Sequence, residues 1–419
     1  MNVGSIIKYY RTKQGMTQTE LAEGICSTSH LSKIETNMYA ANEETVGMLL
    51  EKLGLKLEEV SGRLNEMKEL LQEFIEAIFT QDRELAATLY VQVIENQDYM
   101  LSSELVNLYH LYIYRYQLWN QEAEKANESL KILQKIKNTF NSIELNIFSF
   151  VQAVHCSTKE DHEMTIKHMN NFLENPIPIG NYWVAECHYQ LAYAHISINQ
   201  NEAGLITGKK AYDLYVAECN FTRQIHAQMI LGICYTRLGL YNEAIVVYRP
   251  LLRNVRMHYK NSLYVSVLIN YSRCMYLSKE YSKVQRHVDE ALQLVEPYTD
   301  SHGTALLIWL ENALKTKKVN KTWHSRVLLL REISAIINDK YYHHYSIYLE
   351  KLEFSQVDGI KYAVKWLYPY LIKVNAYSDA REVVEEIIDY FNQVGDYVKA
   401  KEYYDQWRTL IEKERNYHV

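Results

Sequence analysis

The sequence predicts an all-α protein, with a small N-terminal domain of short helices followed by a long array of paired helices. Glycine and proline are scarce, at 14 and 5 of 419 residues, whereas an all-β fold needs many more turns. Apolar residues recur every three or four positions along most of the chain, as in amphipathic helices. A chain of this length exceeds one compact core, so at least two structural units are expected.

Two short helices joined by a tight turn are predicted within residues 16–35. Thr17 can cap the first helix, and Glu20 completes a capping box. Ser27 or Thr28 can cap the second helix. Two short helices at a steep angle form a helix-turn-helix, whose second helix enters the major groove of DNA in proteins that use it for recognition.

Flanking helices complete this first domain. A helix over residues 3–14 precedes it and ends at Gly15. Asn42 caps a fourth helix with an acidic first turn, which Gly54 ends. The resulting prediction is a helix-turn-helix domain over residues 1–60, a linker helix over 61–80 and a helical repeat domain over 81–419.

The charge of the chain limits how it can bind DNA. The net charge is −6, so the protein is no general binder of polyanions. Residues 1–60 hold six basic and eight acidic side chains, a net charge of −2. Affinity for DNA must therefore come from the local placement of charge and from two copies that bind together.

The helices beyond residue 80 repeat in pairs. The clearest pair, residues 227–248, carries the pattern L-G-x-x-Y-x-x-L-G-x-Y-x-x-A-x-x-x-Y, which resembles the tetratricopeptide repeat. Small residues at Gly232 and Ala244 allow the two helices to approach closely. The register recurs about 40 residues earlier and later, and eight or nine pairs would form a right-handed superhelix with a concave face. Weaker copies lie at 102–137, 141–174, 302–338 and 378–413.

Motifs for enzymatic chemistry, metals and cofactors are not found in the sequence. The six cysteines are widely spaced, which favours thiols in helical cores over a disulfide or zinc framework. No glycine-rich phosphate loop, G-x-S-x-G or H-E-x-x-H occurs. We expect a cytoplasmic protein without a signal peptide or membrane span, no enzyme, no metal and no cofactor.

The run from Arg11 to Glu35 resembles the helix-turn-helix of the Cro/repressor class over about residues 3–57. The resemblance implies that Arg11 and Glu35 pair across the domain. It also implies two sets of DNA contacts. The phosphate-contact candidates are Gln18, Ser27, Ser32 and Asn37, and the base-readout candidates are Thr28, Ser29, His30 and Lys33.

The concave face of the repeat domain is the candidate ligand site, since the first helix of each pair lines it in tetratricopeptide arrays. Amide side chains can bond a peptide backbone, arginine can hold a carboxylate and tyrosine can pack on apolar side chains. The alternative is that many of these residues belong to the core between helices. The candidate peptide contacts are Tyr112, Arg115, Asn146, Glu186, Tyr189, Tyr193, His226, Met229, Arg237, Asn270 and Arg273.

A Cro-type helix-turn-helix domain (the reader, residues 1–60) followed by a tetratricopeptide array resembles the RRNPP group of bacterial quorum-sensing regulators, nearest its NprR and PlcR branch. The resemblance implies a dimer or tetramer that binds a palindromic operator in double-stranded DNA and is switched by a short signalling peptide. Two alternatives stay open. The helical domain could sequester a response-regulator protein, or it could act on one as a phosphatase in the manner of Rap proteins.

Overall fold

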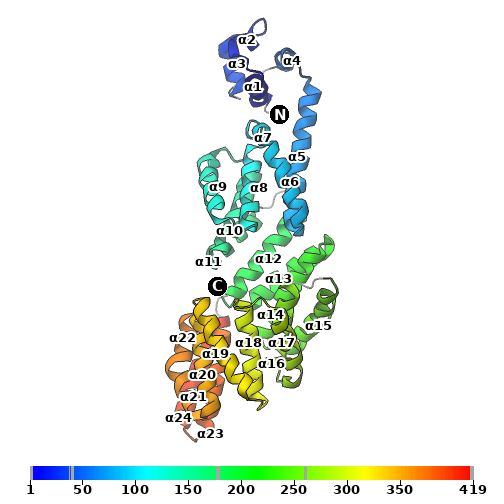
Figure 1. Ribbon diagram of the computed structural model, residues 1–419. Coiled ribbons are helices and arrows are strands. Elements are labelled where there is room, and N and C mark those ends of the chain that lie inside the picture. The colour runs from blue at the N-terminus through cyan, green and yellow to red at the C-terminus, as the bar shows by residue number, and fades with distance from the viewer. Residues whose placement is uncertain (1–2, 37, 39–41, 176–179, 259–261, 416–419) are drawn as a thin grey trace. The chain divides into compact units, whose positions relative to one another are not determined.

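The computed structural model describes residues 3–36, 38, 42–175, 180–258 and 262–415, and these residues form helices and turns without a β-strand (Figure 1). The all-α prediction is confirmed. The chain divides into two compact units, Met1–Gln190 and Leu191–Val419. None of the helices in the described ranges is both long and apolar enough to span a membrane.

Four short helices form the N-terminal part of unit 1. The predicted capping box is confirmed, because Thr17 Oγ1 accepts a hydrogen bond from the Glu20 amide at 3.2 Å and the Glu20 carboxylate accepts one from the Thr17 amide at 2.7 Å. Ser27 caps the next helix and Asn42 the fourth. The chain leaves the first helix through Gly15, whose φ of 71° is costly for other residues. The four are α1 (Val3–Lys13), α2 (Gln18–Ala22), α3 (Thr28–Glu35) and α4 (Glu43–Lys52).

A long helix, α5 (Leu57–Thr80), follows and contains the whole predicted linker segment 61–80. Its buried face packs on α6 and α8 (Figure 1). The buried Tyr99 ring of α7 meets the Tyr9 ring of α1 edge-on at 5.6 Å and lies 4.8 Å from the Arg63 guanidinium of α5. The remaining helices of unit 1 are α6 (Arg83–Glu95), α7 (Gln97–Leu101), α8 (Val106–Trp119), α9 (Ala123–Ile136), η1 (Lys137–Thr139), α10 (Ser142–Thr158) and α11 (His162–Glu174), and α12 (Asn181–Ser197) spans the boundary between the units.

Unit 2 is a series of helices in which each packs on the next. The close approach predicted at Gly232 is confirmed, because a Cβ there would lie 2.4 Å from the ring of the buried Tyr248. The repeat pattern did not predict the helices between residues 340 and 373, which include the single π-helical stretch of the described chain. The helices are α13 (Asn201–Ala217), α14 (Phe221–Arg237), α15 (Tyr241–His258), α16 (Ser262–Leu277), α17 (Tyr281–Leu294), α18 (Asp300–Lys315), α19 (Lys321–Ile336), α20 (Lys340–Phe354), α21 (Gln356–Tyr362), η2 (Ala363–Leu367), α22 (Tyr368–Lys373), α23 (Tyr377–Gln393) and α24 (Tyr397–Arg415).

Candidate functional sites

The outer face of α3 carries the residues predicted to read DNA bases. Leu31 and Ile34 are buried and anchor the helix, which turns the opposite face outward. Thr28, Ser29 and Lys33 are exposed on that face, as are the cap Ser27 and, in part, His30 and Ser32. Lys33 lies in the last turn of α3, where the helix dipole favours a cation. Asn37, the remaining DNA-contact candidate, lies outside the described residues.

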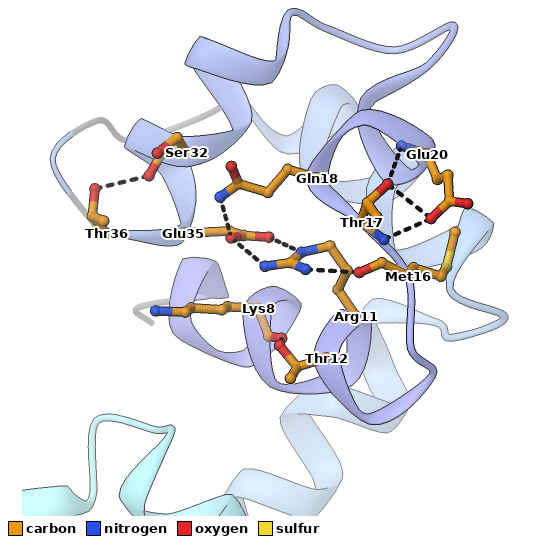
Figure 2. A network of polar contacts seen from close by, with 10 residues as sticks. All are labelled: Lys8, Arg11, Thr12, Met16, Thr17, Gln18, Glu20, Ser32, Glu35 and Thr36. Carbon is orange, nitrogen blue, oxygen red and sulfur yellow. Dashed lines mark hydrogen bonds and ion pairs between the residues drawn. The ribbon is translucent and has the colours of Figure 1, made fainter.

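A polar network fixes α3 against α1 and α2 (Figure 2). Arg11 forms a two-pronged ion pair with Glu35, with Nε to Oε1 at 2.6 Å and Nη2 to Oε2 at 3.0 Å, so the expected pairing is confirmed. Its Nη1 donates to the Met16 carbonyl at 2.8 Å, and Gln18 Nε2 donates to Glu35 Oε2 at 2.8 Å. The hydrogen bond to Glu35 raises the pKa of Arg11 against the effect of burial. The network therefore sets the angle between the helices that a DNA groove would meet.

Two phosphate-contact candidates also have structural roles. Ser27 Oγ accepts from the His30 amide at 3.2 Å, and Gln18 holds Glu35 as described. Neither role uses up the side chain, because a hydroxyl keeps its own O–H donor and an amide carries two N–H donors. Both residues can thus hold the domain together and still donate to a DNA phosphate.

The peptide-contact candidates of unit 1 lie on α8, α10 and α12. Tyr112, Arg115, Asn146 and Glu186 are all buried. Arg115 Nη2 lies 4.0 Å from Glu186 Oε1, which places opposite charges of α8 and α12 together. Asn146 Nδ2 donates to the carbonyls of Phe172 and Asn175 and so closes the end of α11. Tyr189 is half-buried on α12, one turn from Glu186.

The candidates of unit 2 lie at the end of α12 and on α14 and α16, which pack on each other. Tyr193 is the most exposed, at 44%. Arg237 Nη1 donates to the Ile196 carbonyl at 2.6 Å, and Asn270 bonds Ser266 in its own helix. His226 and Met229 of α14 are half-buried.

Arg273 of α16 is the centre of a dense ionic cluster. Its guanidinium lies 2.7 Å from Glu311 of α18, and 3.2 Å and 2.9 Å from Asp379 and Glu382 of α23. Burial opposes the charge on Arg273, but the three carboxylates raise its pKa well above the ordinary value. Burial and the neighbouring acids raise the pKa of Glu382 to about 8, with Arg273 acting in the opposite direction.

The role of α23 is a feature that the sequence did not predict. Besides the Arg273 cluster, Arg381 Nη2 donates to the Arg237 carbonyl at 3.0 Å, and Asn199 Nδ2 donates to the Asn375 carbonyl at 2.8 Å. Helix α23 thus contacts residues of α14 and α16 that were candidates for the peptide site. Its acidic residues are visible in the sequence, but partners more than a hundred residues away are not.

Known proteins resemble both the N-terminal helices and the chain as a whole. Residues 7–60 match the family described as Helix-turn-helix, HTH_3. The transcriptional activator NprA of Geobacillus stearothermophilus is 22% identical over 397 residues, which cover 92% of this chain and 97% of NprA. NprR in complex with its cognate peptide NprX has a similar fold, with a TM-score of 0.61 and 16% identity over 83% of this chain and 99% of NprR. A Rap protein complexed with competence and sporulation factor has a TM-score of 0.67 and 15% identity, covering 84% and 99% of the two chains.

These likenesses support an RRNPP-family regulator. The match to NprA spans the helix-turn-helix domain and the repeats together, so the chain resembles that transcriptional activator over nearly its whole length. In this chain the helix-turn-helix domain carries the exposed face of α3. The helical pairs hold the buried charges at Arg115 and Arg273.

Proposed function

We propose that the chain is a cytoplasmic transcription regulator that binds a palindromic operator as a dimer or tetramer and is switched by a short signalling peptide. The outward face of α3 carries the proposal. It is polar and exposed, and the Arg11–Glu35–Gln18 network holds it at a fixed angle. The match of nearly the whole chain to a transcriptional activator also supports this proposal.

Operator binding would follow from the chemistry of that face. The Lys33 ammonium can donate to guanine O6 and N7, and the hydroxyls of Thr28 and Ser29 can donate or accept. Because the reader has a net charge of −2, one copy would bind weakly. Two readers placed on the half-sites of a palindrome would add their contacts, which makes oligomerisation the natural point of control.

Substitution of Lys33 tests the base-reading role. Lys33→Ala should weaken binding to the specific operator by about 1–3 kcal/mol and leave non-specific binding nearly unchanged. Lys56→Ala, which removes an exposed cation at the start of α5, is the matched control and should change operator affinity little. Gel shifts with operator and unrelated duplexes measure both, and unchanged operator affinity in Lys33→Ala would rule out base readout by this residue.

The peptide switch would act through the helical pairs. NprR has a cognate peptide and shares the fold. A peptide that binds the α14–α16 face must compete with the contacts from α23, whereas one on α8–α12 would meet Arg115 and Glu186. Such a ligand shifts the population of states only if its affinity differs between them. Breaking the α23 contacts would supply that difference.

Gel shifts on genomic fragments, with and without candidate peptides, test the switch directly. The expected result is a peptide-dependent change in operator affinity together with a change in oligomer size by light scattering. A co-purified peptide identified by mass spectrometry would name the ligand. Sequence-independent DNA binding that no peptide alters would refute the proposal.

The fold shared with a Rap protein supports a second candidate function, which is sequestration of a response-regulator protein by the helical pairs. A pull-down of phosphorelay proteins with the full chain would detect it. The two functions differ in one readout, since sequestration predicts a stoichiometric complex without DNA. Loss of phosphate from the captured regulator would instead indicate a phosphatase.

A further inference from the structure

A cluster of positive charge lies on α15 and α17 and shares no residue with either candidate site. Three arginines of α15 occupy positions i, i+4 and i+7, so they lie on one face of the helix. Helix α17 adds an arginine and a histidine. Together with Leu252, Tyr264 and Glu290 they line a cavity of about 260 Å³, and the five basic residues are Arg249, Arg253, Arg256, Arg286 and His287.

The cluster has more positive charge than its neighbours neutralise. Glu290 is the one acid of its lining, and it already accepts from the Tyr264 hydroxyl at 2.6 Å and lies 3.6 Å from Arg256. In the described part of the chain, Arg253 and Arg286 have no carboxylate partner. Like charges one helical turn apart repel each other. A chain with a net charge of −6 nevertheless keeps these arginines together.

His287 lines this cavity, and the positive charges of the neighbouring arginines act on its ring. Its ring packs on Tyr271 with centroids 5.3 Å apart, and its buried Nδ1 has no hydrogen-bond partner among the described residues. Burial lowers the pKa of His287, and the charges of Arg286 and Arg256 lower it further against the effect of Glu290. An anion in the cavity would offset the two arginine charges.

We propose that this cavity binds a small phosphorylated anion that carries more than one phosphoryl group, such as a pyrophosphate or a nucleoside diphosphate. The planar arginine fork matches phosphate oxygens, and arginine clusters are the common means of phosphate recognition. Arg249 and Arg256 are seven residues apart, which is about 10 Å along the helix axis, so the row exceeds one phosphate. The four arginines are exposed around a half-open hollow of about 260 Å³, a size that suits a small anion better than an extended polyanion such as DNA.

Calorimetric titration of the full chain with pyrophosphate and with ADP tests the proposal. The Arg253→Gln/Arg286→Gln double variant removes two arginines that have neither a carboxylate nor a hydrogen-bond partner among the described residues, and it should fold normally, as its thermal unfolding will show. Lys283→Gln is the control, because it removes an exposed cation of α17 that does not line the cavity. We expect saturable binding at one site, roughly tenfold or more weaker in the double variant and unchanged in the control.

The pKa of His287, followed by nuclear magnetic resonance, should rise when pyrophosphate is added. No saturable binding of either probe, or equal binding in the double variant, would overturn the proposal. So would equal affinity for sulfate, because the site would then take any anion. If unrelated duplex DNA bound through Arg253 and Arg286 while both probes failed, the surface would belong to nucleic acid and the phosphate site would be wrong.

Discussion

Two arginine-centred networks hold the molecule together, one in each unit, and they differ in charge balance. Arg11 meets one carboxylate, Glu35, and a neutral amide completes the network. Arg273 meets three carboxylates within 3.2 Å. A matched pair needs no change in protonation to be stable, whereas an excess of buried acid favours binding a proton. The helix-turn-helix domain thus rests on a matched ion pair, and α23 on a cluster whose net charge depends on pH.

The largest effect should come from Arg273→Met, which leaves three neighbouring carboxylates without their shared cation. Loss of one side of a buried ion pair costs about 3–5 kcal/mol, and urea unfolding followed by circular dichroism measures it. The control Lys283→Met removes an exposed i,i+3 pair with Glu280 and should cost less than about 1 kcal/mol. Similar losses in the two variants would show that the Arg273 cluster contributes no more than a surface pair.

Glu35→Gln should have the next largest effect, since it takes the charged acceptor from both Arg11 and Gln18. We expect a loss of about 1–3 kcal/mol in the free energy of unfolding of the reader. Operator affinity should fall with it, because α3 loses its fixed angle to α1. A variant with full stability and full operator affinity would show that the matched ion pair has no role in positioning α3.

The pH dependence of stability distinguishes the Arg273 cluster from the Arg11–Glu35 pair. The pKa of Glu382 in the folded chain is about 8, above its ordinary value of 4.5, so the folded state holds this proton more tightly than the unfolded state does. The proton on Glu382 therefore stabilises the folded chain fully at pH values below 4.5, and this stabilisation is lost as the pH rises through about 8. Urea midpoints measured across this range should fall with rising pH. Glu382→Gln should flatten that slope, and the exposed Glu243→Gln should not.

Gln18→Ala should have the smallest effect, since it removes a single part-buried hydrogen bond, worth about 0.5–1.5 kcal/mol. The informative quantity is the difference between two losses. If Gln18 only supports Glu35, operator affinity should fall no more than reader stability. A larger fall in affinity would indicate a direct bond from the second amide N–H to a DNA phosphate.

Local features of the fold could be predicted from the sequence. The caps at Thr17, Ser27 and Asn42 act within three residues, so their side chains and targets are read together. The close approach of the two helices at Gly232 lies within one pair and follows from the repeat pattern, whereas the contact of Gly232 with Tyr248 was not predicted. The Arg11–Glu35 pair was accessible only through resemblance to a known class.

Contacts between distant pairs could not be predicted in this way. Asp379 and Glu382 are more than a hundred residues from Arg273, and a helical pattern gives the outward face of a helix but not what lies opposite. Arg273 was predicted to contact a peptide, and its contacts with three acids of its own chain were not predicted. Helix α7 has only five residues, and nothing in its pattern shows that Tyr99 would contact α1.

The length of α5 gives the reader a mechanical dependence on the helical pairs. Its 24 residues extend over about 36 Å and carry buried side chains along the whole helix, from Val60 near the end that follows α4 to Phe79 near the other end. A stiff helix of that length acts as a lever, so a tilt of about 5° at one end moves the other end about 3 Å. That displacement equals the length of a hydrogen bond. Small adjustments among the helical pairs would therefore be large on the scale of a single hydrogen bond made by α3.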